Sequence, residues 1–197
     1  MDKSTERIIE FLQQRVSVTE SEALEFAGMF QKKKFRKKQF VVQPDFVARH
    51  RYYILEGALR SFIVDDSGQE TTIALAIDDW WITDYNSYIY QQPATLFVEA
   101  VSNATVLQLS YENEQKLKAS NSKFQAFFCI IAERGLAAQQ RRIMTNLTQN
   151  AEQRYESFVK KYPGFVLTIP QYIIASFLGM STEFLSKIRN NKLTKKS

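Results

Sequence analysis

Hydrophobic periodicity changes along this chain, and that change limits the folds it can adopt. Residues 35–110 contain short runs rich in β-branched and aromatic residues, namely FVV, RYYIL, LRSFIV, TTIALAI, TLFVEA and TVLQLS. Such runs are typical of β-strands. Turn sequences lie between them, and Asp65-Asp66-Ser67-Gly68 predicts a tight hairpin. Many short strands at this spacing predict a jelly roll or a small barrel.

Helices are expected on both sides of the strands. Residues 4–30 predict one or two helices, and from about residue 112 to 147 the apolar residues recur every three or four positions. A further short helix at 151–162 is expected to stop at Pro163-Gly164. The sequence therefore predicts an α+β chain. Its expected units are a β-roll domain at 1–116, a long helix at 117–147 and a helical domain at 148–197.

The segment QYIIASFLGMSTEFLSKIRN, at 171–190, predicts two short helices that meet at a tight corner. Gly179 follows an apolar helical run, at the position where a helix ends with positive φ. Ser181 then stands at the N-cap of the next helix, with Glu183 in its first turn. Because Ala175 is small, the two helices are expected to cross closely.

The outward face of the second helix is hydrogen-bonding or basic. Its predicted members are Thr182, Glu183, Ser186, Lys187, Arg189 and Asn190. Such a face suits the major groove of DNA, where base edges offer donors and acceptors to a helix. The alternative is an ordinary corner of two helices with a solvated polar face.

Positive charge gathers at the C-terminal end of the chain. The net charge is +5, and residues 141–197 hold ten Lys and Arg against three Asp and Glu. Such a balance is expected of a surface that contacts phosphates, with a solubilising tail as the alternative. A second basic cluster, KKKFRKK at 32–38, is interpreted as a solvated edge rather than as part of a DNA surface.

The helix predicted at 117–147 must bury an apolar stripe. Its members include Phe124, Phe128, Ile131 and Ala138. A dimer contact competes with a contact to the chain's own β-domain, and the dimer is the favoured interpretation. Cys129 lies in the same run and is interpreted as a buried thiol. Because it is the only cysteine, a disulfide framework and a four-cysteine metal or iron–sulfur site are excluded.

Several of these segments resemble the Crp/Fnr regulators, the family of the cyclic-AMP receptor protein. The segment at 171–190 is similar to their helix-turn-helix, and AEQRYESFVKKYPGF is similar to the segment that precedes it. YYILEGALRSFIVDDSGQETTIALAIDDWWITDYNSY, with Gly57, Gly68 and Trp80-Trp81, is similar to the β-roll of the branch with a short C-terminus. The resemblance implies a cyclic-nucleotide-binding-like β-roll, a dimerisation helix at 117–147 and a helix-turn-helix DNA-binding domain.

The resemblance also implies a homodimeric bacterial transcription regulator that binds a palindromic operator in double-stranded DNA. The residues that would contact bases and phosphates are Thr182, Glu183 and Lys187, flanked by Ser181 and Ser186. RNA polymerase and an unidentified small-molecule effector are further candidate partners.

The chain departs from the family pattern at its C-terminus. Only seven residues follow Asn190, too few for a full β-wing. The phosphate contacts of that wing are therefore expected to be absent or to come from Lys192, Lys195 and Lys196.

A second departure lies in the phosphate-binding cassette of the cyclic-nucleotide sensors. In those sensors an Arg near the end of the cassette pairs with the phosphate, whereas this chain has Ala94-Thr95 there. Asp78, Asp79 and Asp84 would repel a cyclic phosphate. Binding of cyclic AMP is therefore not expected.

Aromatic residues near the cassette allow two interpretations. The residues concerned are Trp80, Trp81, Tyr85 and Tyr88, with Ala94 and Thr95. They would either line an apolar pocket for another effector or form the core of the β-roll, and core is the favoured interpretation.

Other classes of function lack the residues they need. The single histidine, His50, excludes the metal site of cupin enzymes, and it is interpreted as a surface or turn residue rather than a haem ligand. No Ser/His/Asp set, P-loop or dinucleotide glycine pattern occurs, so no enzyme activity, metal or cofactor is expected. The lack of a signal peptide or a long apolar run predicts a cytoplasmic protein with no membrane partner. A β-roll binding or scaffolding module without sequence-specific DNA binding is the alternative function.

Overall fold

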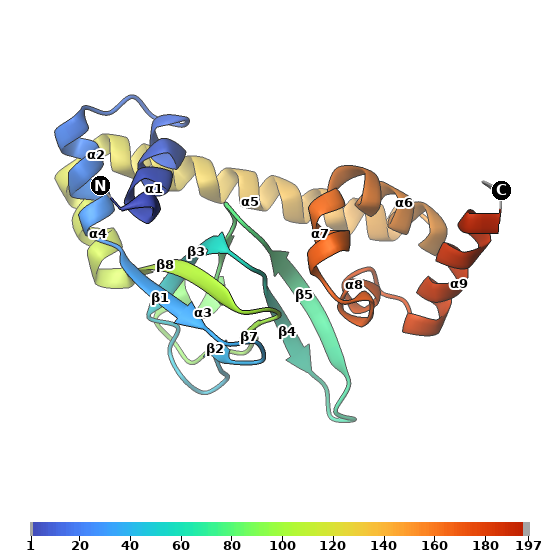
Figure 1. Cartoon of the computed structure of the whole chain (residues 1–197). Helices are drawn as coiled ribbons and strands as arrows, with labels where there is room; N and C mark the ends of the chain where they lie inside the picture. The colour runs from blue at the N-terminus through green and yellow to red at the C-terminus, as the bar shows by residue number, and fades with distance from the viewer. Residues whose placement is uncertain (1, 195–197) are drawn as a thin grey trace.

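The computed structural model describes residues 2–194, with side chains described through residue 191. The element order is α1 (Lys3–Gln13), α2 (Glu20–Gly28), β1 (Gln31–Phe35), β2 (Phe40–Val42), β3 (His50–Glu56), β4 (Leu59–Val64), β5 (Glu70–Ala76), β6 (Trp81–Ile82), α3 (Tyr85–Tyr90), β7 (Phe97–Ala100), β8 (Ala104–Ser110), α4 (Tyr111–Ser120), α5 (Ser122–Thr148), α6 (Ala151–Lys161), α7 (Pro163–Thr168), α8 (Gln171–Phe177) and α9 (Thr182–Thr194). The strands form a roll at one end, α6 to α9 lie at the other, and α5 connects the two (Figure 1). No helix among the described residues is long and apolar enough to cross a membrane.

The β-roll consists of two four-stranded antiparallel sheets, with strand orders β1-β8-β3-β6 and β2-β7-β4-β5. All six predicted strands are present, which confirms the predicted roll. Strand β1 was not predicted, because its sequence QKKKF is exposed at four of five positions and shows no apolar alternation. The cluster at 32–38 thus overlaps β1, which forms a solvated sheet edge.

Two glycines sit at turns of the roll where side chains are disfavoured. Gly57 has φ +96°, and a Cβ at this position would lie 2.5 Å from the carbonyl oxygen of Asn103. Gly68 has φ +83° and closes the hairpin between β4 and β5, which extends beyond the roll (Figure 1). Asp65 fixes that hairpin by accepting the backbone N–H of Gln69 at 3.0 Å.

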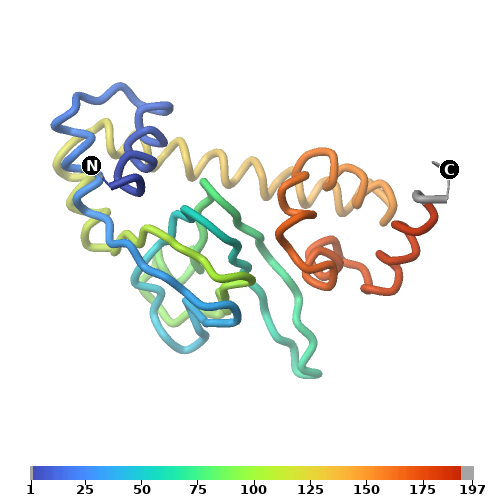
Figure 2. The backbone as a smooth tube through the Cα atoms, in the orientation of Figure 1, coloured from blue at the N-terminus to red at the C-terminus, as the bar shows by residue number. Residues whose placement is uncertain are grey.

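Helices α1 and α2 pack on the β-roll together with α4 and the first turns of α5, as Figure 2 shows by the blue and yellow segments that lie side by side. The predicted continuous helix is broken at Asn121. The side chain of Asn121 accepts the backbone N–H of Lys123 at 2.9 Å and so caps α5. The long helix therefore begins at Ser122 rather than at residue 117.

The first half of α5 belongs to the core of the monomer. Phe124 and Phe128 are buried, and the half-buried Ile131 packs on the same cluster. Phe124 and Phe128 therefore make the intramolecular contact that was the less favoured alternative, and assigning these two to a dimer contact was wrong. The dimer contact of Ile131 stays a prediction. The interpretation of Cys129 as a buried thiol was also wrong, because its side chain is exposed.

The C-terminal helices share one core. Its buried members include Tyr155, Phe158, Phe165, Ile169, Ile173, Ile174, Ala175, Leu178, Leu185 and Ile188, and Ala58, Leu75 and Val101 of the β-roll join them. Helix α6 ends at Lys161, just before Pro163, as predicted, and Pro163 then begins the short helix α7, which was not predicted. Proline is tolerated at the first position of a helix because the N–H that it lacks has no intrahelical partner there.

Candidate nucleic-acid interface

The predicted corner between α8 and α9 is present. Gly179 has φ +67°, and a Cβ there would meet nothing within 4 Å, so backbone conformation rather than space requires a glycine. The N–H of Met180 bonds to the carbonyl of Ala175 at 3.0 Å across the corner. The Ser181 hydroxyl oxygen accepts the N–H of Phe184 at 3.1 Å, as predicted for an N-cap.

Packing fixes which side of α9 faces outward. Leu185 and Ile188 are buried against α8, where Ala175 is also buried. The predicted outward residues fall into two groups. The exposed ones are Ser181, Glu183, Lys187 and Asn190, and the half-buried ones are Thr182, Ser186 and Arg189.

Phe184 is a residue of this surface that the sequence reasoning missed. Its ring is 47% exposed, and it lies one position after Glu183 and three before Lys187, so it adjoins their face of the helix. Because it is apolar, it was not counted among the hydrogen-bonding or basic residues of the outward face. The signal that distinguishes it is its position one residue before Leu185, outside the buried i, i+3 pair formed by Leu185 and Ile188.

Glu183 is held in its charged form. Hydrogen bonds from its own backbone N–H and from the Ser181 hydroxyl lower the pKa of its carboxyl. A carboxylate at the first turn of a helix also interacts favourably with the helix dipole. Glu183 is therefore a hydrogen-bond acceptor on the outward face. The backbone of Lys192 lies in α9 but its side chain is outside the described residues, and Lys195 and Lys196 lie outside the described chain.

The helix-turn-helix is docked on the edge strand β5, a contact that sequence spacing did not predict. The N–H of Thr72 donates to Ser176 Oγ at 2.9 Å, and the Ser176 hydroxyl donates to the carbonyl of Glu70 at 3.1 Å. Arg142 of α5 donates to the carbonyls of Thr72 and Phe177, at 3.1 and 3.0 Å. One side chain of the long helix thus binds both the β-roll and the corner.

Asp84 organises the cassette region. Its carboxylate is buried, and it accepts the backbone N–H of Ser87 at 3.1 Å, of Thr95 at 2.9 Å and of Leu96 at 3.1 Å. The sequence reasoning assigned Asp84 only a repulsive role. In the structure, the Asp84 side chain accepts hydrogen bonds from backbone N–H groups on both sides of this loop.

The aromatic residues near the cassette surround a guanidinium group. Arg51 pairs with the buried Glu114 (Nη2 to Oε1, 3.0 Å), and Tyr88 donates its hydroxyl to the same carboxylate at 2.8 Å. Burial raises the pKa of Tyr88. The rings of Trp81, Tyr85, Tyr88 and Phe128 lie within 6 Å of the Arg51 guanidinium. Trp81 and Tyr88 are therefore part of the packed structure, whereas Tyr85 is 42% exposed.

The six residues predicted as an effector pocket thus do different things. Tyr88 and Ala94 are buried, and Thr95 is tied through its backbone to Asp84. Trp80 is 36% exposed, and its ring meets those of Tyr162 and Phe165 edge-on, at centroid distances of 5.7 and 5.4 Å. Trp80 therefore links the β-roll to the C-terminal helices.

The second half of α5 exposes an apolar face. Its exposed members are Leu136, Ile143, Met144 and Leu147. Ala138, which was predicted to be a dimer contact, lies one turn before Arg142 and hence on the side of α5 that faces β5.

Side chains that could ligate a metal are not grouped among the described residues. Within the part of the chain that is described, no cluster of three or more His, Cys, Asp or Glu side chains could hold a metal ion. His50 lies at the start of β3, half-buried, and burial lowers its pKa.

Comparison with known proteins supports the architecture. Residues 32–121 match the cyclic nucleotide-binding domain family. FixK2 from Bradyrhizobium japonicum has a TM-score of 0.75 at 16% identity, covering 85% of this chain and 86% of that one. A CooA mutant from Carboxydothermus hydrogenoformans has a TM-score of 0.68 at 15% identity, covering 99% and 86%. CLP from Xanthomonas campestris, described as a c-di-GMP-responsive global regulator, has 0.65 at 14% identity, covering 90% and 93%. No curated protein matches the sequence.

Proposed function

Because residues 32–121 match the cyclic nucleotide-binding domain family and the whole chain has the fold of the Crp/Fnr regulators, we propose that it is a DNA-binding transcription regulator. The observation that carries the proposal is the Gly179 corner, which presents Glu183, Lys187 and Asn190 on the exposed side of α9. Helices presented in this way enter the major groove. The protein would act in the cytoplasm as a regulator rather than as an enzyme.

Each outward side chain of α9 has a suitable partner on DNA. Lys187 donates to the acceptor edge of guanine, and the ionised Glu183 accepts from the amino group of cytosine. The half-exposed ring of Phe184 fits the methyl group of thymine. Ser181 and Thr182, at the start of α9, lie where backbone N–H groups bind phosphate.

A palindromic operator requires a two-fold dimer, and we place its contact on the second half of α5. Leu136 and Ile143 are seven residues apart, and Leu147 follows Ile143 by four, which is the spacing of a coiled-coil seam. Cys129 occupies the same register one heptad before Leu136 and is exposed. In a parallel dimer the two copies of each of these residues face each other.

Cyclic AMP is not the proposed effector. The backbone N–H groups of Thr95 and Leu96 already bond to Asp84, and Ala94 supplies no cation. A cyclic phosphate would have to displace an internal carboxylate and would gain no charged partner in return, so its binding is disfavoured. Isothermal titration should detect no micromolar binding of cyclic AMP or cyclic GMP.

Selection of duplexes from a random pool tests the DNA-binding proposal. We expect a palindromic site whose half-sites lie about 34–36 Å apart, or a multiple of that distance. Lys187→Ala should weaken binding to the selected site by about 1–3 kcal/mol and relax the preference at one base pair. Lys116→Ala, an exposed lysine on α4, is the matched control. A pool without enrichment, together with an inert Lys187→Ala, would favour the scaffolding module.

A further inference from the structure

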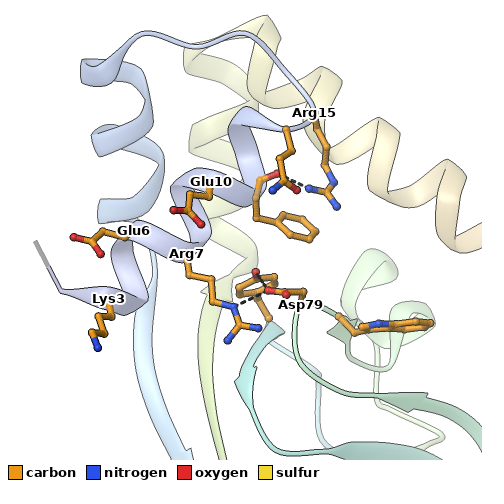
Figure 3. Close-up of a pocket in the computed structure, with 10 residues that line it drawn as sticks. Lys3, Glu6, Arg7, Glu10, Arg15 and Asp79 are labelled. Carbon is orange, nitrogen blue, oxygen red and sulfur yellow. Dashed lines mark hydrogen bonds and ion pairs between the residues drawn. The ribbon is translucent and has the colours of Figure 1, made fainter. Parts of the chain in front are cut away.

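A polar pocket lies outside the β-roll, between α1 and the turn that precedes β6 (Figure 3). Its volume is about 520 Å³, within the range of small-molecule sites. The lining side chains come from Lys3, Glu6, Arg7, Glu10, Phe11, Arg15, Tyr53, Asp79 and Trp80, among others. The pocket shares Trp80 with the residues described above, but it is separate from the cassette that Asp84 closes.

On one side of this pocket, the charged side chains pair with each other. Arg7 Nε donates to Asp79 Oδ1 at 2.7 Å, and the Tyr53 hydroxyl donates to the same carboxylate. Arg7 also lies 3.7 Å from Asp78. Arg7 therefore has carboxylate partners within the chain and does not need one from a ligand.

Arg15 differs from Arg7 in this respect. Its guanidinium lies 3.4 Å from the centre of the Phe11 ring, and Nη1 donates to the Phe11 carbonyl at 2.5 Å. Its Nε is buried, and no hydrogen-bond partner reaches it from the described residues, nor does any of their carboxylates form an ion pair with this side chain. Burial and the nearby positive charge of Arg134 lower the pKa of Arg15. The Asp79 carboxylate, which already bonds to Arg7 and Tyr53, attracts Arg15 without forming an ion pair with it, so Arg15 can still pair with an added anion.

We infer that this pocket binds a small organic monocarboxylate, with its carboxylate at Arg15 and its apolar part between Phe11 and Trp80. The aromatic rings favour an apolar body. Glu6 and Glu10 line the same pocket, so a ligand with two or more negative charges, such as a phosphate ester, is repelled more strongly than a monocarboxylate. In Figure 3, Arg7 extends from α1 toward Asp79, whereas Arg15 lies apart from it, just beyond the C-terminal end of α1.

Occupancy of the pocket would reach the C-terminal helices through Trp80. The indole forms part of the pocket and also packs edge-on against Tyr162 and Phe165. A ligand that shifts Trp80 therefore changes the packing that holds the helix-turn-helix against the roll. This coupling rests on the proposed function, whereas binding of the ligand does not.

Tryptophan fluorescence tests the binding directly, because Trp80 and Trp81 are the two tryptophans of the chain. In the full-length Trp81→Phe variant, Trp80 is the reporter, and titration calorimetry on the unmodified chain covers the case in which that variant is unstable. Benzoate and hexanoate serve as probes, with benzamide and inorganic phosphate as comparators. We expect saturable binding of the monocarboxylates that is at least about tenfold tighter than that of either comparator.

Arg15→Gln should weaken monocarboxylate binding about tenfold or more. Arg36→Gln removes an exposed arginine that does not line the pocket and should leave binding unchanged. Three results would overturn the inference: no saturable binding of either monocarboxylate, equal binding of inorganic phosphate, or an unchanged affinity in Arg15→Gln. These titrations contain no DNA, so they test the pocket separately from the proposed function. If the chain binds the ligand but no specific DNA sequence, the ligand site is supported and the proposed function is wrong.

Discussion

The two halves of α5 carry similar apolar residues but meet different surroundings. In the first half, Phe124, Phe127 and Phe128 are buried among aromatic side chains of α1, α2 and the β-roll. In the second half, Leu136 and Leu147 are 71% and 81% exposed. The first half thus completes the fold of one chain.

The second half of α5 has one side that contacts the rest of the chain and one side that is exposed. On one side, Arg142 binds β5 and the corner of the helix-turn-helix. On the other, the heptad of Leu136 and Ile143 has no counterpart among the described residues. Contiguous exposed apolar side chains on a helix are typical of an interface. We therefore expect the first half of α5 to determine folding and the second half to determine assembly.

The largest effect should come from the buried half. Phe127→Ala removes a fully buried ring that contacts Phe11, Phe26 and Phe128, and it should lower the free energy of unfolding by about 3–5 kcal/mol. Leu147→Ala is the matched change in the exposed half and should cost about 0.5 kcal/mol or less in the monomer. Urea unfolding at several protein concentrations measures both. If both variants lose the same unfolding free energy in dilute solution, the two halves of α5 do not have the different roles proposed here.

The next effect concerns assembly. Ile143→Glu places a charge in the proposed seam, where burial without a partner is unfavourable, so it should give monomers that keep their helical content. Arg141→Glu, exposed on another side of α5, should leave the dimer intact. Sedimentation velocity measures the state of each variant, and oxidation should join the unmodified chains through Cys129. If the unmodified chain is a monomer at tens of micromolar, the proposed dimer contact on α5 is wrong.

Local features of the sequence were enough to predict the corner of the candidate DNA site. Gly179, Ser181 and the pair Leu185 and Ile188 define an end, a cap and a buried face within a dozen residues. Each depends on backbone conformation or helical spacing, which neighbouring residues determine. Six of the eight described β-strands were predictable for the same reason. The exceptions are β1, whose lysines hide the pattern, and β6, which is only two residues long.

The missed features depend on residues far apart in the chain. Apolar spacing shows that α5 has buried faces, but it cannot say whether the chain itself or a second copy covers them. The bonds from Arg142 to Thr72 and from Asp84 to Leu96 likewise arise only after the roll has closed. The partner of Trp80 is more than eighty residues away, in α6 to α7.

A smaller effect tests whether the two halves act as one rigid helix. Gly135 lies between them, and a Cβ there would meet nothing within 4 Å. Gly135→Ala should raise the free energy of unfolding by about 0.5–1 kcal/mol, because alanine favours the helix. The same change at Gly179, where φ is +67°, should instead lower it by about 1–2 kcal/mol. Thermal unfolding distinguishes the two signs. If the Gly135→Ala chain is stable but monomeric, the α5 helices of the two protomers approach each other most closely at residue 135, where the added methyl group keeps them apart.

The smallest effect concerns the anchor of the buried half at its first turn. Glu22 of α2 accepts hydrogen bonds from Lys123 Nζ at 2.8 Å, from the backbone N–H of Thr19 at 2.7 Å and from the Asn121 side chain at 2.8 Å. Together these contacts lower its pKa from 4.5 to about 2. Since the folded chain favours the ionised carboxylate, the contribution of Glu22 to stability is complete above pH 4.5 and is lost as the pH falls toward 2. Glu22→Gln should therefore make the decline of unfolding free energy over this window shallower, and Lys123→Gln should do so through the other partner. Urea unfolding between pH 6 and pH 3 measures the slope, at about one-unit intervals. If the pH dependence of the unfolding free energy is unchanged in both variants, the Glu22 contacts do not stabilise the buried half. If the variants lose the dimer but keep their unfolding free energy, these contacts serve assembly instead.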